Sequence, residues 1–167
     1  MQMTSMHDYT LHVMHRWFRR YTREYDMKHR STKDVFEQWI SAFQSKDVET
    51  IISLYHDDAV NWQIADQPAE GKAGIRRMMI SFFTSFPDAY TNIENIMYDG
   101  DWTSWEWIGG GTFLKDMGDI KATGKQFEIR GCGFFLIQKG KIKLQRGYWD
   151  KASWCKQIGI DLDSVIK

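Results

Sequence analysis

The chain has 167 residues, of which 43% are hydrophobic and 15% aromatic, and this composition suits a single globular domain with a substantial core. Its 22 Lys and Arg residues balance its 22 Asp and Glu residues, so no net charge would attract nucleic acid or an anionic membrane surface. No apolar run is long enough to cross a bilayer, and the N-terminus lacks a secretory apolar core. We therefore expect a cytoplasmic protein with neither of those two partners.

Residues 1–30 differ in composition from the rest of the chain, because they carry six Lys and Arg residues against Asp8, Glu24 and Asp26. Apolar residues recur there at alternating spacings of three and four, which places them on one face of a helix. These residues are Leu11, Met14, Phe18, Tyr21 and Tyr25. We expect a basic amphipathic helical extension over 1–30 that docks on protein, followed by the main domain over 31–167; contact with a membrane surface or nucleic acid is the less favoured alternative.

Three helices are predicted at the start of the main domain. Ser31 and Asp34 form a capping pair before a helical apolar pattern that reaches Phe43. Asp47 is placed to cap a second helix, which we expect to include Tyr55. The GKAG segment at 71–74 opens a third helix, and Pro87 ends it.

Strands follow the helices. Residues 59–64 alternate apolar side chains with Asn61 and Gln63, so this strand has two unlike faces and either could turn inward. After Pro87 we expect four further strands, over 90–98, 102–113, 125–138 and 141–150. Glycines at 109–111, 131 and 133 indicate a strongly bent sheet. Helices followed by an antiparallel meander predict an α+β fold.

The last strand ends in an acid. Strict alternation along KIKLQRGYWD puts Asp150 on the same face as Arg146 and Tyr148, together with Ile142 and Leu144, and we interpret this face as interior. A carboxylate there would be a proton carrier if burial raised its pKa. Asp150 also precedes the segment KASWCKQIG, where Asp is a favoured helix N-cap. Both interpretations stay open.

The order of several short motifs carries a family resemblance. DDAVNW, a G-K-x-x-I helix ending in FPD, the DGD turn, EW then GGGT, ATGK, GKI, YWD and QIG occur in that order over residues 32–160. The chain resembles the SnoaL-like, polyketide cyclase-like branch of the nuclear transport factor 2 and ketosteroid isomerase-like superfamily. The resemblance implies a cone-shaped, cystatin-like roll, in which a curved, mostly antiparallel sheet wraps around three helices and encloses a hydrophobic pocket. It also implies a homodimer formed through the sheet.

The resemblance bears on Asp150 most directly. In SnoaL-like cyclases a carboxylate at the end of the last strand is the general acid and base, and Asp150 looks like its equivalent. The ketosteroid isomerase acids are replaced here by Gln63 and Gly133. The limonene epoxide hydrolase arginine and aspartate are replaced by Trp107 and Gly109. Neither of those two chemistries is therefore expected.

From residues and resemblance together, we predict a cofactor-independent acid/base enzyme, of cyclase, isomerase, lyase or hydrolase type, that acts on a small hydrophobic, ring-shaped compound. The alternative is a protein of the same fold that binds such a ligand without turning it over. The candidate catalytic residues are Asp150, Tyr148 and Asn61, and the candidate pocket residues are Trp39, Trp62, Gln63, Glu106, Phe134 and Arg146. Asn61 and Gln63 could instead face solvent, and Glu106 could pair with Arg130 on a neighbouring strand. Cys132 and Cys155 lack metal-ligand spacing, so neither a metal nor a cofactor is predicted.

Overall fold

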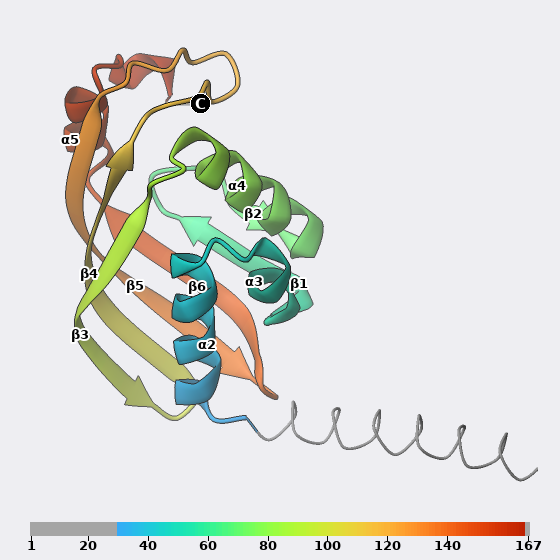
Figure 1. The fold of residues 1–167 in the computed structure, drawn as a ribbon. Coiled ribbons are helices and arrows are strands. Elements are labelled where there is room, and N and C mark those ends of the chain that lie inside the picture. The colour runs from blue at the N-terminus through green and yellow to red at the C-terminus, as the bar shows by residue number, and fades with distance from the viewer. Residues whose placement is uncertain (1–29, 166–167) are drawn as a thin grey trace, which may run out of the picture.

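The computed structural model describes residues 30–165 (Figure 1). The predicted extension over 1–30 lies outside these residues, except for Arg30, so its helix and its docking stay predictions. In chain order the elements are α2 (Thr32–Gln44), α3 (Val48–Ser53), β1 (Tyr55–Gln63), β2 (Ala69–Glu70), α4 (Gly71–Ser85), β3 (Tyr90–Asp99), β4 (Trp102–Thr112), β5 (Gln126–Gln138), β6 (Lys141–Trp149), α5 (Lys151–Ile158) and a 3₁₀ helix, η1 (Leu162–Ser164).

Local sequence sets the helix starts as predicted. Ser31 and Asp34 form a reciprocal capping box at the start of α2. The Asp47 side chain accepts a hydrogen bond from the Thr50 backbone N–H at the start of α3. Such caps satisfy backbone donors that have no partner within the helix. One boundary was predicted wrongly, because Tyr55 begins β1 and is not part of α3.

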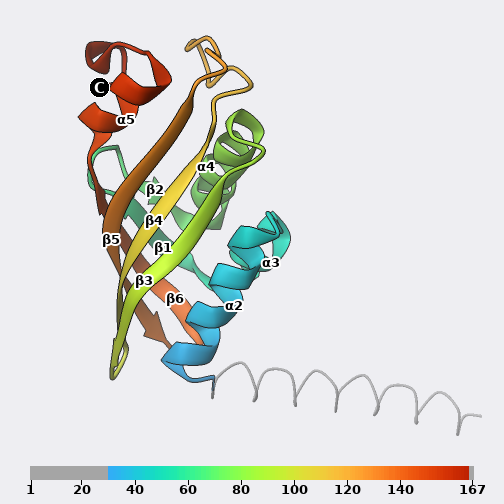
Figure 2. The ribbon, with the colours of Figure 1, turned by 60° about the vertical axis from the view of Figure 1, so that its left-hand side comes forward.

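The sheet has six strands in the order β2-β1-β6-β5-β4-β3. All neighbours are antiparallel except β1 and β6, which run parallel. The sheet curves around α2, α3 and α4, which lie on its concave side, while α5 lies at one end of the sheet beside β5 (Figures 1 and 2). This arrangement is the predicted cone-shaped α+β roll. None of the helices in the described part of the chain is long and apolar enough to span a membrane.

Two apolar clusters fill the concave side. The first lies between α2, α3, α4 and the sheet, and Phe36 is at its centre, with ring centroids 5.4 Å from Trp105 and 5.2 Å from Phe135. The second lies beneath α5, where Phe127 and Trp154 pack edge to face. The two clusters meet at Phe82, whose ring centroid lies 5.4 Å from that of Phe86.

A bulge in β6 decides which side chains face the helices. Leu136 pairs with Leu144, whereas the next residue, Ile137, pairs with Ile142, so Lys143 is an extra residue in β6. Ile142 is fully buried in the first cluster, but beyond the bulge the odd-numbered residues face inward. The prediction that Leu144 and the even-numbered residues after it line the interior is therefore wrong. Strict alternation cannot detect one added residue.

Candidate functional site

A polar cluster lies on the concave side where β1 and β6 run in parallel. It consists of Trp39, Tyr55, Asn61, Gln63 and Gln145. Tyr55 and Asn61 have no exposed surface, and Gln145 is 5% exposed. All of the side chains in this cluster are uncharged, and no charged residue is buried anywhere among residues 30–165. The interior beside this cluster is therefore aromatic and neutral, and the other buried polar residues, Ser85, Thr91 and Thr103, lie outside the cluster.

The cluster is joined by a continuous set of hydrogen bonds. The Trp39 indole N–H donates to the Tyr55 hydroxyl oxygen (3.1 Å), and the Tyr55 hydroxyl donates to Gln145 Oε1. Asn61 Nδ2 donates to the same Gln145 oxygen (2.8 Å), and Gln63 Nε2 donates to Asn61 Oδ1 (2.8 Å). Burial raises the pKa of the Tyr55 hydroxyl well above its ordinary value, so Tyr55 stays protonated at neutral pH and acts as a donor.

Glycines beside the cluster allow side chains to lie directly on the sheet. Gly133 and Gly147 are paired across β5 and β6. A Cβ atom at Gly147 would lie 2.1 Å from Gln63 Oε1, and one at Gly133 would lie 2.6 Å from Trp105 Nε1. Gly131 lies two residues before Gly133 on the same face of β5, and a Cβ atom there would lie 2.3 Å from Cζ2 of the Trp107 ring. Any larger residue at these positions would displace Gln63 or a tryptophan that belongs to the first apolar cluster or packs against it.

Three of the predicted site residues, Trp39, Asn61 and Gln63, are brought together in the polar cluster. The predicted placement of Asp150 in the interior is wrong, because this residue is exposed and caps α5. Its carboxylate accepts hydrogen bonds from the Ser153 hydroxyl and from the Ser153 backbone N–H (3.0 Å), and these bonds hold the pKa of the carboxyl below its ordinary value. A catalytic role of Asp150 stays a prediction.

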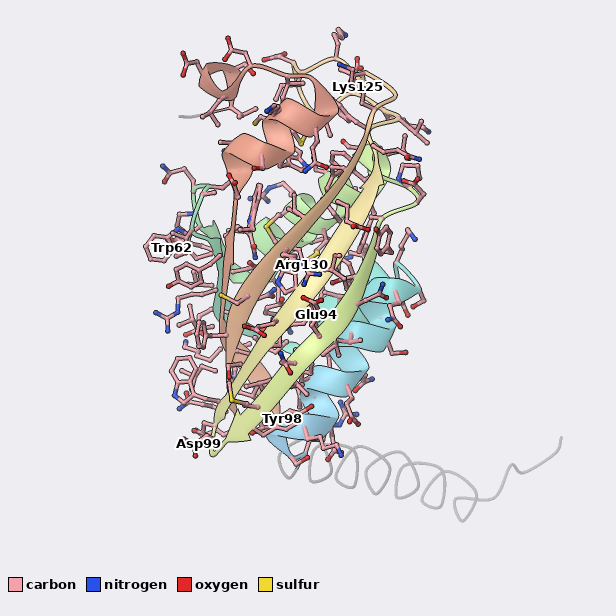
Figure 3. All side chains as sticks on the ribbon, turned by 90° about the vertical axis from the view of Figure 1, so that its left-hand side faces the viewer. Trp62, Glu94, Tyr98, Asp99, Lys125 and Arg130 are labelled. Carbon is pink, nitrogen blue, oxygen red and sulfur yellow. The ribbon has the colours of Figure 1, made fainter. Side chains whose placement is uncertain are left out.

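Four other predicted site residues lie on the outer, convex face of the sheet, so their predicted placement in a pocket is wrong. The Arg146 guanidinium lies over the rings of Trp102 (5.6 Å) and Phe134 (5.8 Å). The Tyr148 ring packs edge to face on Phe134. Trp62 is 41% exposed at the edge of this face (Figure 3). The extra residue in β6 turns the side chains of Arg146 and Tyr148 to the outer face. Phe134 and Trp62 are the cross-strand partners of Arg146, so their side chains lie on the same face.

Glu106 is also exposed on the outer face, where it accepts a hydrogen bond from Asn95 (2.6 Å) and does not pair with Arg130. Arg130 pairs with Glu94 instead (Figure 3). A register shift between Ile93 and Asn95 leaves Glu94 as the extra residue of β3, and this bulge brings its carboxylate to Arg130. The predicted pocket position of Glu106 and its predicted pairing are both wrong.

Sequence reasoning missed Tyr55 and Gln145. Tyr55 fits the apolar spacing of α3, and Gln145 falls on the wrong face when β6 is read without its bulge. The useful clue is the pair Asn61 and Gln63, because two amides on one face of a strand require polar partners once that face is buried. Among residues 30–165, no three His, Cys, Asp or Glu side chains are arranged to hold a metal ion.

The model of the SnoaL-like polyketide cyclase family matches residues 33–158, most of the 167-residue chain. The chain belongs to this family. No curated protein matches the chain.

Solved structures of similar fold include a SnoaL-like polyketide cyclase from Jannaschia sp. CCS1, with 13% identity, a TM-score of 0.71, and coverage of 78% of this chain and 92% of that chain. The polyketide cyclase IdmH from Streptomyces antibioticus has 22% identity, a TM-score of 0.65, and coverage of 78% and 100%. A limonene epoxide hydrolase-like enzyme of M. tuberculosis has 19% identity, a TM-score of 0.63, and coverage of 76% and 88%. At these identities the likeness establishes the fold.

Proposed function

We propose that this chain is a cofactor-independent enzyme that acts on a small, hydrophobic, ring-shaped compound bound on the concave side of the sheet. The observation that carries the proposal is the polar cluster, a neutral set of hydrogen-bonding groups buried among aromatic rings. It ends at Gln63, which is only half-buried and lies over Gly147. Membership of the SnoaL-like polyketide cyclase family supports chemistry on a small molecule.

The chemistry that we propose is stabilisation of negative charge on a ligand oxygen by the Trp105 indole N–H, which lies beside the cluster over Gly133. Tyr55 and Asn61 are fully buried and donate to Gln145, so they orient the cluster and do not themselves reach a ligand. A donor in a water-excluded site acts strongly on a carbonyl that becomes an oxyanion. Removing one such donor in enzymes that depend on it lowers kcat by roughly 10²–10³-fold. The raised pKa of Tyr55 makes it a donor of hydrogen bonds and a poor base. A ring-forming or isomerising step at a polarised carbonyl fits this set of groups.

Asp150 is the proposed proton carrier. Its place at the end of β6 supports this role, whereas its hydrogen bonds to Ser153 oppose it, because a carboxylate with a lowered pKa is a weak base. To act, Asp150 must leave the cap. Asp150→Asn keeps most of the capping ability and removes the base, so turnover should fall by roughly 10²-fold while folding persists. Unchanged turnover would exclude Asp150 as the proton carrier, and the uncharged hydrogen-bonding groups would then be the only proposed catalytic groups.

A second candidate function is ligand binding without turnover. The observation that favours it is the absence of charged side chains from the buried part of residues 30–165, together with the exposure of Asp150. A site with neutral groups only can hold a compound firmly and still lack a general base. This candidate uses the same residues as the first and differs in the fate of the ligand.

Titration of the ¹⁵N-labelled protein with neutral ring ketones and alcohols, followed by mass spectrometry of the incubated compounds, tests both candidates. Shifts centred on Gln63, Trp105 and Trp107 together with a new product support the enzyme. The same shifts without any product support the binding protein. Shifts confined to the outer face of the sheet would contradict an interior site.

We also propose that the protein is a homodimer formed through the outer face of the sheet. Met97, Ser104, Phe134, Arg146 and Trp62 are successive cross-strand neighbours there, so they form a row across five strands. Met97 is 67% and Trp62 is 41% exposed, which leaves much apolar surface in water.

Phe134→Glu, in the middle of this row, should convert a dimer into a monomer in light scattering. Ile80 on α4 is also an exposed apolar residue, so Ile80→Glu serves as the matched control and should leave the mass unchanged. A wild-type mass of one chain at all concentrations would contradict this assembly.

A further inference from the structure

We propose that the interior site recognises a hydroxyl group of its ligand and holds it between Gln63 Oε1 and the Trp105 indole N–H. The inference rests on the proposed interior site and adds to it the chemical class of compound that this site selects. It follows from the direction of the hydrogen bonds in the polar cluster and from the pairing of Gly133 with Gly147.

The direction of these hydrogen bonds is fixed at one end by Trp39. An indole N–H can only donate, so the Tyr55 oxygen must accept from it, and the Tyr55 proton must point onward to Gln145. That proton sets the orientation of the Gln145 amide, with its oxygen facing Tyr55. The Asn61 amide then turns its NH₂ group to the same oxygen (2.8 Å).

The remaining step determines what the cluster presents to a ligand. With its NH₂ group on Gln145, Asn61 offers only its oxygen to Gln63, so Gln63 must donate to it through Nε2 (2.8 Å). The Gln63 amide atom that remains for a ligand is therefore Oε1, which lies over Gly147 and only accepts hydrogen bonds. One donor-only group at Trp39 thus fixes an acceptor at the half-buried end of the cluster.

A donor lies beside this acceptor. The hydrogen bonds found among residues 30–165 do not include the Trp105 indole N–H, which lies 2.6 Å from the Cβ position of Gly133. Gly133 is the direct cross-strand partner of Gly147, which underlies Gln63 Oε1. Cβ positions of directly paired residues are about 4.5–5.5 Å apart. One oxygen atom that bonds to two groups spans about 5–6 Å between them, which is of the same order as the spacing of the two Cβ positions that Trp105 and Gln63 cover.

This pair of groups discriminates between oxygen functions. A hydroxyl donates to Gln63 Oε1 and accepts from the Trp105 N–H at the same time. An ether or ketone oxygen can only accept, so it would leave the Gln63 oxygen without a donor from the ligand. A carboxylate also has no proton to donate to Gln63 Oε1, and its binding would bury a charge, which is unfavourable. The site therefore selects neutral ring compounds that carry a hydroxyl group.

Matched pairs of aromatic alcohols and their methyl ethers test the inference, because each pair shares one ring skeleton. Phenol with anisole and 2-naphthol with 2-methoxynaphthalene are titrated into the full-length protein, and Kd is measured by calorimetry. We expect the alcohol of the better-fitting pair to bind roughly tenfold more tightly than its ether, as one hydrogen bond to a buried partner predicts. The Trp105 indole N–H resonance should shift with the alcohol and much less with the ether.

Gln63→Met supplies the critical variant, since it keeps the length of the side chain and removes the acceptor. In this variant the Kd values of the alcohol and the ether should differ by no more than about twofold. Gln126→Met replaces an exposed glutamine and should keep the roughly tenfold difference of the wild type. Equal binding of alcohol and ether to the wild type, with shifts at Gln63 and Trp105, would overturn the hydroxyl inference and retain the interior site. Failure of all four compounds to shift these residues would overturn both.

Discussion

Gln145→Met is the substitution that tests the polar cluster most directly. Gln145 Oε1 accepts hydrogen bonds from Tyr55 and from Asn61, and both donors are fully buried. Methionine has a similar length and leaves no large cavity, so the main effect is the loss of an acceptor. The Tyr55 hydroxyl would then have no acceptor, and Asn61 would keep only its 3.4 Å contact with the Tyr55 oxygen.

The magnitude follows from these two donors. A buried donor without a partner costs about 1–3 kcal/mol, so the loss at Tyr55 should lower the free energy of unfolding by about that amount, and the weakened bonding of Asn61 adds to it. Urea unfolding followed by circular dichroism measures this difference. Gln126→Met is the matched control, because Gln126 is exposed, and it should change the free energy of unfolding by less than about 0.5 kcal/mol.

A double-mutant cycle separates the hydrogen bond from general damage to packing. Tyr55→Phe removes the donor that Gln145→Met leaves without a partner, so the double variant should cost less than the sum of the single variants by about 1–3 kcal/mol. Strict additivity of the two substitutions, or a loss below about 0.5 kcal/mol for Gln145→Met alone, would refute the reasoning about the cluster.

Three further predictions concern other parts of the chain. Asp150→Ala should lower Tm at neutral pH more than Asp150→Asn does, because Asn keeps most of the capping ability. The pKa of Asp150 is lowered in the folded state, so its contribution is present above the ordinary carboxyl pKa and is lost as the pH falls. The Tm gap between the wild type and Asp150→Ala should therefore narrow in acid. Gly147→Ala should cost about 1–3 kcal/mol in urea unfolding by forcing Gln63 aside, and an undiminished cost in a Gln63→Ala background would contradict that cause. Residues 6–26 should show slow amide hydrogen exchange in the intact protein, and rapid exchange throughout the segment would exclude docking.

The sequence was sufficient for features that depend on neighbours along the chain. Ser31 and Asp47 were placed correctly as helix caps, and the alternative role of Asp150 as the cap of α5 is confirmed. A cap is recognised from three or four consecutive residues, and an apolar helix face from a dozen. The glycines at 109–111, 131 and 133 predicted a bent sheet, and the family motifs added the roll in which that sheet wraps around three helices.

The candidate site depends on contacts that no local pattern reveals. The inward orientation of Gln145 requires the extra residue at Lys143, and the contact of Asn61 with Gln145 requires the parallel pairing of β1 and β6. A one-residue shift in register moves every following side chain to the other face of the sheet. This is why Arg146 and Tyr148 were assigned to the interior although they lie on the outer face.

The parallel pairing of β1 with β6 also affects how the protein is made. Asn61 and Gln145 are 84 residues apart, and Tyr55 and Gln145 are 90 apart, so the cluster closes only when the last strand joins the sheet. Contacts across such separations form late, because long loops must be ordered first. On the ribosome, helices α2 to α4 and strand β1 are complete long before Gln145 emerges. Any shortened product that lacks β6 will therefore carry Tyr55 and Asn61 without their acceptor, as a target for chaperones and proteases.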